Sequence, residues 1–288
     1  MTELFIAPFA EFGFMQRALL GCLIISCSAA PVGVFLMLRR MSLTGDAMAH
    51  AILPGAAVGY LVSGLSIGAM TLGGMVAGCL VVLFSGWISR ATMVTEEASL
   101  AAFYLISLAL GVLMISGSGS QLDLLHILFG SALALDDTAL YFLAAICSVT
   151  WCVLAVIFRA LVLECVDRQF LQTVSGLSAA AHFSFLILVV LNLVVGFNAL
   201  GTLMSVGIMI LPAAIARYWF RQLEGMLLAS ILTAFLASYL GLVLSYHLGW
   251  STGPVIILVL GVLYLLSTIL GTQGGIVQRW LKPRHLTA

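Results

Sequence analysis

The stretch Met41–Gly64, MSLTGDAMAHAILPGAAVGYLVSG, carries an acid, an imidazole and a proline between two long apolar runs, so we expect it at membrane depth. On a helix, Asp46 and His50 are four residues apart and lie on one face, about one turn from each other. Pro54 has no N–H to donate to the carbonyl four residues back, which belongs to His50. One short helix therefore offers a carboxylate oxygen, an imidazole nitrogen and a backbone carbonyl, which are all ligands for first-row divalent cations.

A structural explanation of the same pair stands beside the cation site. A carboxylate and an imidazole at this spacing could hydrogen-bond each other and hold two helices together. Ionisable side chains at bilayer depth are costly, however, and they usually mark a pathway or a binding site. The residues alone leave both interpretations open.

The composition is typical of a polytopic, all-α membrane protein. Of the 288 residues, 63% are hydrophobic and only 8% are charged, and lipid surrounds a chain of this kind. The formal net charge is zero, and we expect no nucleic-acid partner. The sole lysine is Lys282, so a GxxxxGK[ST] phosphate loop is absent and this chain does not bind ATP in that way.

The apolar segments predict about nine transmembrane helices, with a range of 8–10. A run at 124–135 is too short to cross, so we expect a short re-entrant or interfacial helix near 122–135. The predicted spans are Ala18–Leu38, Met41–Gly64, Ile67–Ser89, Ala98–Ser116, Thr138–Phe158, two within Phe183–Ala216 that divide at Gly196–Gly201, Gly225–Tyr246 and Pro254–Leu270.

The basic residues give the bundle an orientation. The longest polar interval is Glu164–Ala181, and placing it in the cytoplasm puts every basic residue except Arg17 on that side. This bias follows the positive-inside rule. It predicts an extracytoplasmic N-terminus and a cytoplasmic tail over residues 272–288.

Other polar residues have simpler explanations. Asp123 and His126 are three apart where the short 122–135 helix begins, so Asp123 could cap that helix, or both could contact a cation briefly at the outer mouth. Glu96 and Glu97 begin a span, where acids complement the helix dipole. For His182 and His247 we expect interfacial roles.

Several segments resemble one family. RRMSLTGDAMAHAILPGAAVGY is similar to the second-helix signature of zinc/manganese-type ABC transporter permeases, the ABC-3 family. LDLLHILFGSALAL, VDRQFLQTVSGLS, GTLMSVGIMILPAAIAR and LSYHLGWSTGPVIILV resemble further family segments in family order. The likeness runs from about Phe14 to Leu270. One departure is His126, where the family has Ser or Asn.

The resemblance implies a single permease domain over residues 1–288 in the bacterial inner (cytoplasmic) membrane. It implies a homodimer, two cytoplasmic ABC ATPase subunits that hydrolyse the ATP, and an extracytoplasmic metal-binding protein. It also implies that Asp46 and His50 contact the metal. The segment 164–181 becomes the ATPase coupling segment, with Asp167, Arg168, Phe170, Leu171 and Gly176 as its coupling residues.

The function expected is therefore transport of a divalent transition metal, with no permanently bound cofactor. Overall likeness and the several histidines favour Zn²⁺, and Mn²⁺ or Fe²⁺ is the alternative. An iron-chelate permease would have no reason for an Asp/His pair. An intramembrane hydrolase with Asp46 as its catalytic acid would need a second acid or a metal triad in the spans. The polar segment 164–181 argues against an ATP-independent channel or exchanger.

Overall fold

A computed structural model of the chain describes residues 8–64, 66–117, 135–167, 170–171, 173 and 177–281. Within these ranges the chain is helical and has no strand, so the all-α prediction is confirmed. Eight described helices are long and apolar enough to cross a membrane. They are α2 (Gly13–Leu38), α5 (Ile67–Ala91), α6 (Glu96–Gly117), α8 (Asp137–Val166), α10 (Leu177–Leu200), α11 (Thr202–Trp219), α12 (Leu223–Leu248) and α13 (Thr252–Leu270).

The second predicted span is broken into two short helices, α3 (Ser42–Ala51) and α4 (Leu53–Ser63). At 1.5 Å per residue they are about 15 and 16 Å long, so neither crosses alone. The break falls at Ile52, two residues before Pro54. Backbone bonds continue on either side of it, from Ile52 N to Met48 O at 3.3 Å and from Ala56 N to Ile52 O at 3.1 Å. Among the described residues, the pair α3–α4 and the eight long helices correspond to the nine predicted spans.

Two other predicted boundaries have different outcomes. The long apolar run 183–216 divides at Gly201, as expected, and Gly201 has a φ of 91° there. The fifth span was expected to end at Phe158, but α8 continues to Val166. Glu164 therefore lies inside a helix, where Arg39 supplies its countercharge. The predicted helix near 122–135 lies outside the described residues.

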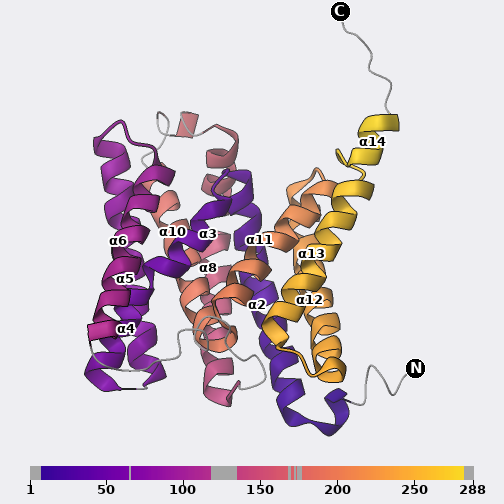
Figure 1. The fold of residues 1–288 in the computed structure, drawn as a ribbon. Coiled ribbons are helices and arrows are strands. Elements are labelled where there is room, and N and C mark those ends of the chain that lie inside the picture. Colours follow the sequence, from indigo (N-terminus) through magenta and orange to yellow (C-terminus); the bar gives the residue numbers. More distant parts are fainter. Residues whose placement is uncertain are drawn as a thin grey trace, which may run out of the picture.

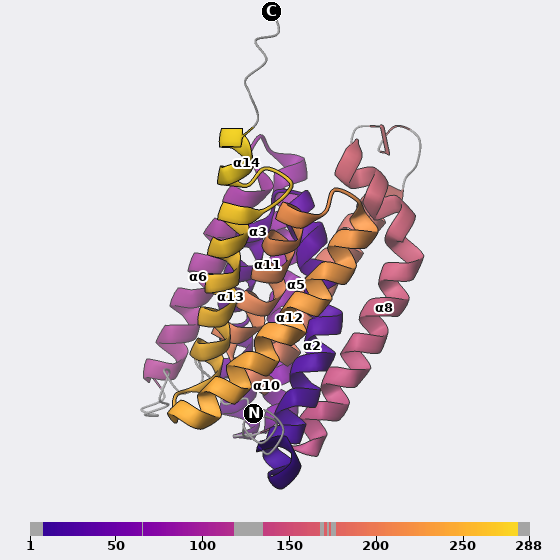
Figure 2. The ribbon, with the colours of Figure 1, turned by 90° about the vertical axis from the view of Figure 1, so that its right-hand side faces the viewer.

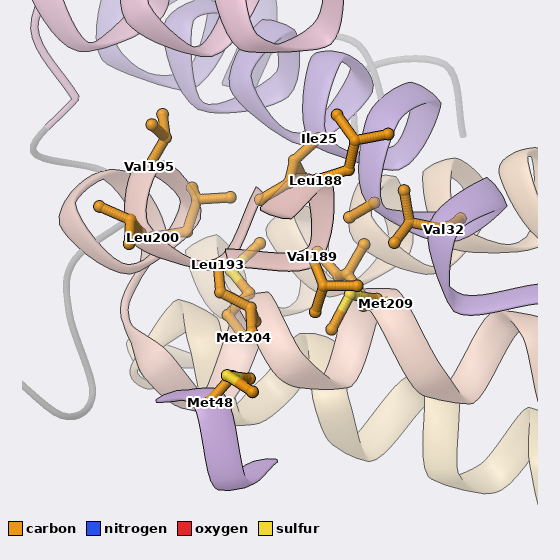
Figure 3. Close-up of a cluster of buried hydrophobic side chains, with 14 of the residues drawn as sticks. Ile25, Val32, Met48, Leu188, Val189, Leu193, Val195, Leu200, Met204 and Met209 are labelled. Atoms are coloured by element: carbon orange, nitrogen blue, oxygen red, sulfur yellow. The ribbon is translucent and has the colours of Figure 1, made fainter. Parts of the chain in front are cut away.

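The core is built around α2 and α10, the two most buried spans. Phe35 of α2 stands edge-on to Phe158 of α8 and Phe185 of α10, with ring centroids 6.0 and 6.3 Å apart. Figure 3 shows buried side chains of α2, α3, α10 and α11 gathered in one cluster. Its labelled members are Ile25, Val32, Met48, Leu188, Val189, Leu193, Val195, Leu200, Met204 and Met209.

Helices α4 and α5 approach so closely that their backbones touch. A Cβ added to Gly55 would lie 2.0 Å from Gly73 O, and one added to Gly73 would lie 2.1 Å from Gly55 O. One helical turn further along α4, a Cβ on Gly59 would lie 2.4 Å from Ala69 O. Small residues at this spacing permit such close contact between membrane helices.

The helices run roughly parallel or antiparallel along one axis, with α4, α5 and α6 on one side and α12 and α13 on the other (Figure 1). Figure 2 views the bundle after a 90° rotation about the vertical axis and shows α8 at one edge. At the upper end of the bundle in Figure 1, three helices end, namely α2, α8 and α11. Three others begin there, namely α6, α10 and α12. We call this the basic end, because Arg39, Arg159, Arg217 and Arg221 lie in or near these helix ends.

Candidate functional site

Asp46 and His50 lie one turn apart on α3, with His50 Nε2 3.9 Å from Asp46 Oδ1. The Asp46 side chain is 68% exposed and that of His50 is 32% exposed. This distance is longer than a hydrogen bond, and the two side chains belong to successive turns of the same helix. The contact therefore does not hold two helices together, which was the structural explanation of this pair.

Helix α6 packs against α3 beside the pair. The His50 ring lies beside Tyr104, with centroids 6.2 Å apart. A cavity of about 190 Å³ lies next to Asp46. Its lining comprises Leu43, Thr44, Asp46, Ala47, Glu97, Leu100, Ala101 and Tyr104. The cavity thus brings a second carboxylate, that of Glu97, to the same space as Asp46.

Pro54 lies where α6 approaches the broken span. A Cβ added to Gly111 of α6 would be 3.1 Å from Pro54 N and 3.3 Å from Leu53 atoms. The break between α3 and α4 is therefore packed directly against α6. This close packing holds the end of α3 against α6. It therefore also positions His50, which lies four residues before Pro54.

One chain offers only part of a coordination shell here. In the described part of the chain, no group of three or more His, Cys, Asp or Glu side chains is arranged to hold a metal ion. A carboxylate that lines a cavity and an imidazole one turn away can contact a passing cation without enclosing it. Transport sites need this modest affinity, because an ion held by a full set of ligands leaves slowly.

Four charged or titratable side chains meet at the basic end, and the sequence analysis missed their association. We call Arg39, Glu96, Glu164 and His182 the charge cluster. Arg39 Nη2 lies 3.2 Å from Glu164 Oε1, and His182 Nε2 lies 2.6 Å from Glu96 Oε1. Arg39 Nη2 also contacts His182 Nδ1. His182, for which we expected an interfacial role, is instead buried inside this cluster.

A sequence signal for the charge cluster existed. Under the orientation predicted from the basic residues, all four members lie at the same end of their spans and hence at a similar depth. Common depth does not say which helices are neighbours, however. The packing of α2 against α8 and of α8 against α10 supplies that information.

Part of the predicted coupling segment is described. Asp167 Oδ1 accepts a hydrogen bond from Phe170 N at 2.9 Å, as the side chain of a helix N-cap does. Phe170 is 52% exposed, whereas Leu171 is only 4% exposed. Phe170 therefore faces outward and Leu171 packs inward. Arg168 and Gly176 lie outside the described residues, as do Asp123 and His126.

Comparison with known proteins agrees with this architecture. The model of the ABC 3 transport family matches residues 11–271. The manganese import system permease protein ScaB of Streptococcus gordonii is 31% identical over 285 residues, covering 99% of each chain. A probable iron transport system membrane protein of Haemophilus influenzae is 30% identical over 258 residues, covering 89% of this chain and 93% of the relative.

A solved structure has the same fold over almost the full length. PsaBC from Streptococcus pneumoniae in complex with Fab aligns with a TM-score of 0.84 and 28% identity. The alignment covers 97% of this chain and 100% of that one. The relatives' names mention manganese and iron, so the expectation of zinc finds no support among them.

Proposed function

Because the chain belongs to the ABC 3 transport family, we propose that it is the permease of an ATP-driven Mn²⁺ importer. Its similarity to permease subunits of metal import systems makes it a transport subunit rather than an enzyme, with ATP hydrolysis in a separate subunit. The observation that carries the proposal is the pairing of an exposed Asp46 with a half-buried His50 on α3, next to the break in the second span.

The donor chemistry favours Mn²⁺ over the zinc that the histidine count had suggested. His182 belongs to the charge cluster, and His247 lies at the far end of α12, beside the ring of Tyr246. The polar side chains that line the cavity next to Asp46 all carry oxygen, and they include those of Thr44 and Glu97. Oxygen donors suit Mn²⁺, whereas tight zinc sites gather thiolates and imidazoles in a tetrahedron.

The working unit is two copies of this chain with two ATPase subunits at the basic end. Two copies would supply two Asp46–His50 pairs, which is enough for a transient coordination shell. An extracytoplasmic binding protein delivers the ion at the opposite end. The positive-inside rule supports a cytoplasmic location for the basic end, with the C-terminus there and the bundle in the bacterial inner membrane.

The transport step follows from the placement of the pair. The ion leaves the binding protein and meets Asp46 and His50 in the space between the two copies. The carboxylate balances part of its charge in a low-dielectric setting, and the imidazole supplies a neutral donor. ATP binding in the partner then moves the helices, so that the pair faces the cytoplasm and the ion is released.

The test is uptake of radiolabelled Mn²⁺ into proteoliposomes that contain the complete complex. Asp46→Asn keeps the side-chain volume but removes the charge, and His50→Ala removes the nitrogen donor. Each should reduce Mn²⁺ uptake at least tenfold without changing assembly by size exclusion. Zn²⁺ in equal amount should be transported more slowly than Mn²⁺ by the unaltered complex.

Matched controls are available at the opposite end of the bundle. Asp137→Asn changes an exposed acid that pairs with Arg17 at 3.6 Å, and His247→Ala changes an exposed imidazole. Both controls should transport normally. Wild-type uptake by the assembled Asp46→Asn and His50→Ala complexes would refute the role of the pair, and faster uptake of Zn²⁺ would refute the choice of metal.

A further inference from the structure

We propose that the charge cluster couples the ATPase-docking segment to α3, so that motion at the cytoplasmic surface moves Asp46 and His50. This inference rests on the proposed transport function. The cluster's members come from four helices: Arg39 follows α2, Glu96 begins α6, Glu164 is near the end of α8 and His182 is near the start of α10.

The cluster links both sides of the coupling segment. Glu164 lies three residues before Asp167, and His182 lies in the second turn of α10, just beyond the segment. Both contact the same guanidinium, that of Arg39. A displacement of the segment between α8 and α10 therefore acts on Arg39 from two directions.

The contacts form one continuous chain of polar side chains. An arginine has only donors, so Arg39 Nη2 donates both to Glu164 Oε1 and to His182 Nδ1. On the other side of the ring, His182 Nε2 lies 2.6 Å from Glu96 Oε1, within ion-pair distance. The guanidinium also lies over the Phe185 ring, 5.1 Å from its centroid, which holds it in place.

A tight turn transmits the position of Arg39 to α3. Met41 N bonds Leu36 O at 2.9 Å and Arg40 N bonds Met37 O at 3.1 Å, the two bonds of a Schellman motif. Arg40 adopts the left-handed conformation that the motif requires, with a φ of 60°. Only three residues separate α2 from α3, so α3 cannot change direction without moving Arg39.

Stability alone is a weak reason for such a cluster. Replacing a buried ion pair by apolar side chains of similar volume is often neutral or stabilising, because desolvation opposes the attraction of the charges. A polar cavity of about 400 Å³ adjoins the cluster and leaves it room to rearrange. Arg39, Arg40, Glu96 and Glu164 all line this cavity. A charged network beside open space suits an element that changes partners during a cycle.

The experiment measures Mn²⁺ transported per ATP hydrolysed in proteoliposomes with the full complex. Glu164→Gln and Glu96→Gln each remove one charge at constant volume. Each should lower Mn²⁺ uptake at least tenfold while ATP hydrolysis stays above half of the wild-type rate, so that the ratio falls at least fivefold. Glu164→Asp keeps the charge and should recover most of the ratio. Glu224→Gln, an exposed acid in the first turn of α12, is the control and should keep the wild-type ratio.

Opposite results overturn the inference. If uptake and hydrolysis fall together and the ratio stays at the wild-type value, the cluster only stabilises the fold. If the ratio and both rates stay at their wild-type values, the cluster has no role in coupling and the inference is also wrong. Glu96 is 13% exposed, so Glu96→Gln keeps the test decisive if Glu164→Gln does not assemble. Failure of the wild-type complex to take up Mn²⁺ would instead refute the proposed function.

Discussion

At the scale of single residues, Arg40 has the least usual backbone. It is the only residue other than glycine with a positive φ in the described part of the chain. The left-handed conformation costs an ordinary L-residue roughly 1–2 kcal/mol, because Cβ approaches the following carbonyl. Glycine usually occupies this place after a helix. The α2–α3 turn therefore keeps an arginine at a cost in stability.

Arg40→Gly should raise the free energy of unfolding by about 1 kcal/mol, because glycine adopts the left-handed region without a Cβ clash. Arg40→Val should lower it, since a β-branched side chain fits that region worst. Thermal unfolding of the purified permease in detergent measures both changes. Equal melting temperatures for all three proteins would show that this turn stores no strain.

The relative positions of residues within one helix could be predicted from the sequence, whereas contacts between residues of different helices could not. The spacing of Asp46 and His50 fixes their common face, and the structure places them one turn apart. The contact between Glu96 and His182 joins residues that are distant in the chain, and no local period encodes it. Glu97 was explained by the helix dipole, yet it lines the cavity beside Asp46 only because α6 packs on α3.

At the scale of elements, hydropathy gave the spans but not their ends. Pro54 lies two residues after the break that precedes α4, and Gly201 lies between α10 and α11, within the interval where the sequence predicted a division. The end of α8 was misplaced by eight residues, from Phe158 to Val166. Arg159 suggested an end at Phe158, but α8 continues for two more turns, and Glu164 in its last turn pairs with the buried Arg39.

The α4–α5 contact yields a prediction for the pair of helices. Gly55→Ala should destabilise the permease by about 1–3 kcal/mol, the usual cost of overpacking, because the new Cβ would meet backbone atoms of Gly73. Gly68→Ala, near the start of α5, adds its Cβ to open space and should be neutral or stabilising. Thermal unfolding of both variants decides the point. Equal stability of the two would mean that α4 and α5 separate easily.

At the scale of the whole molecule, the two ends of the bundle differ in the partners that they suit. The basic end carries the exposed Phe170, and the opposite end carries the exposed Trp250. Exposed aromatic side chains often supply much of the energy of a protein interface. Under the proposed function, Phe170 contacts the ATPase.

Phe170→Asp should therefore weaken binding of the ATPase by about 2 kcal/mol or more, which is roughly thirtyfold in Kd. Titration of the detergent-solubilised permease with its ATPase measures the change. Trp250→Asp is the control, an exposed aromatic at the far end, and should leave that affinity unaltered. An unaffected Kd in the Phe170→Asp protein would remove this side chain from the interface.

The broken second span also has a consequence for biosynthesis. Unlike the eight long spans, α3 and α4 are each too short to insert alone, and α3 carries Asp46 and His50. Only residues 64–66 separate α4 from α5, and the two backbones meet at Gly55 and Gly73. The two helices can thus leave the translocon together as a helical hairpin. The polar half of the span then reaches its depth only after the ribosome has completed α5.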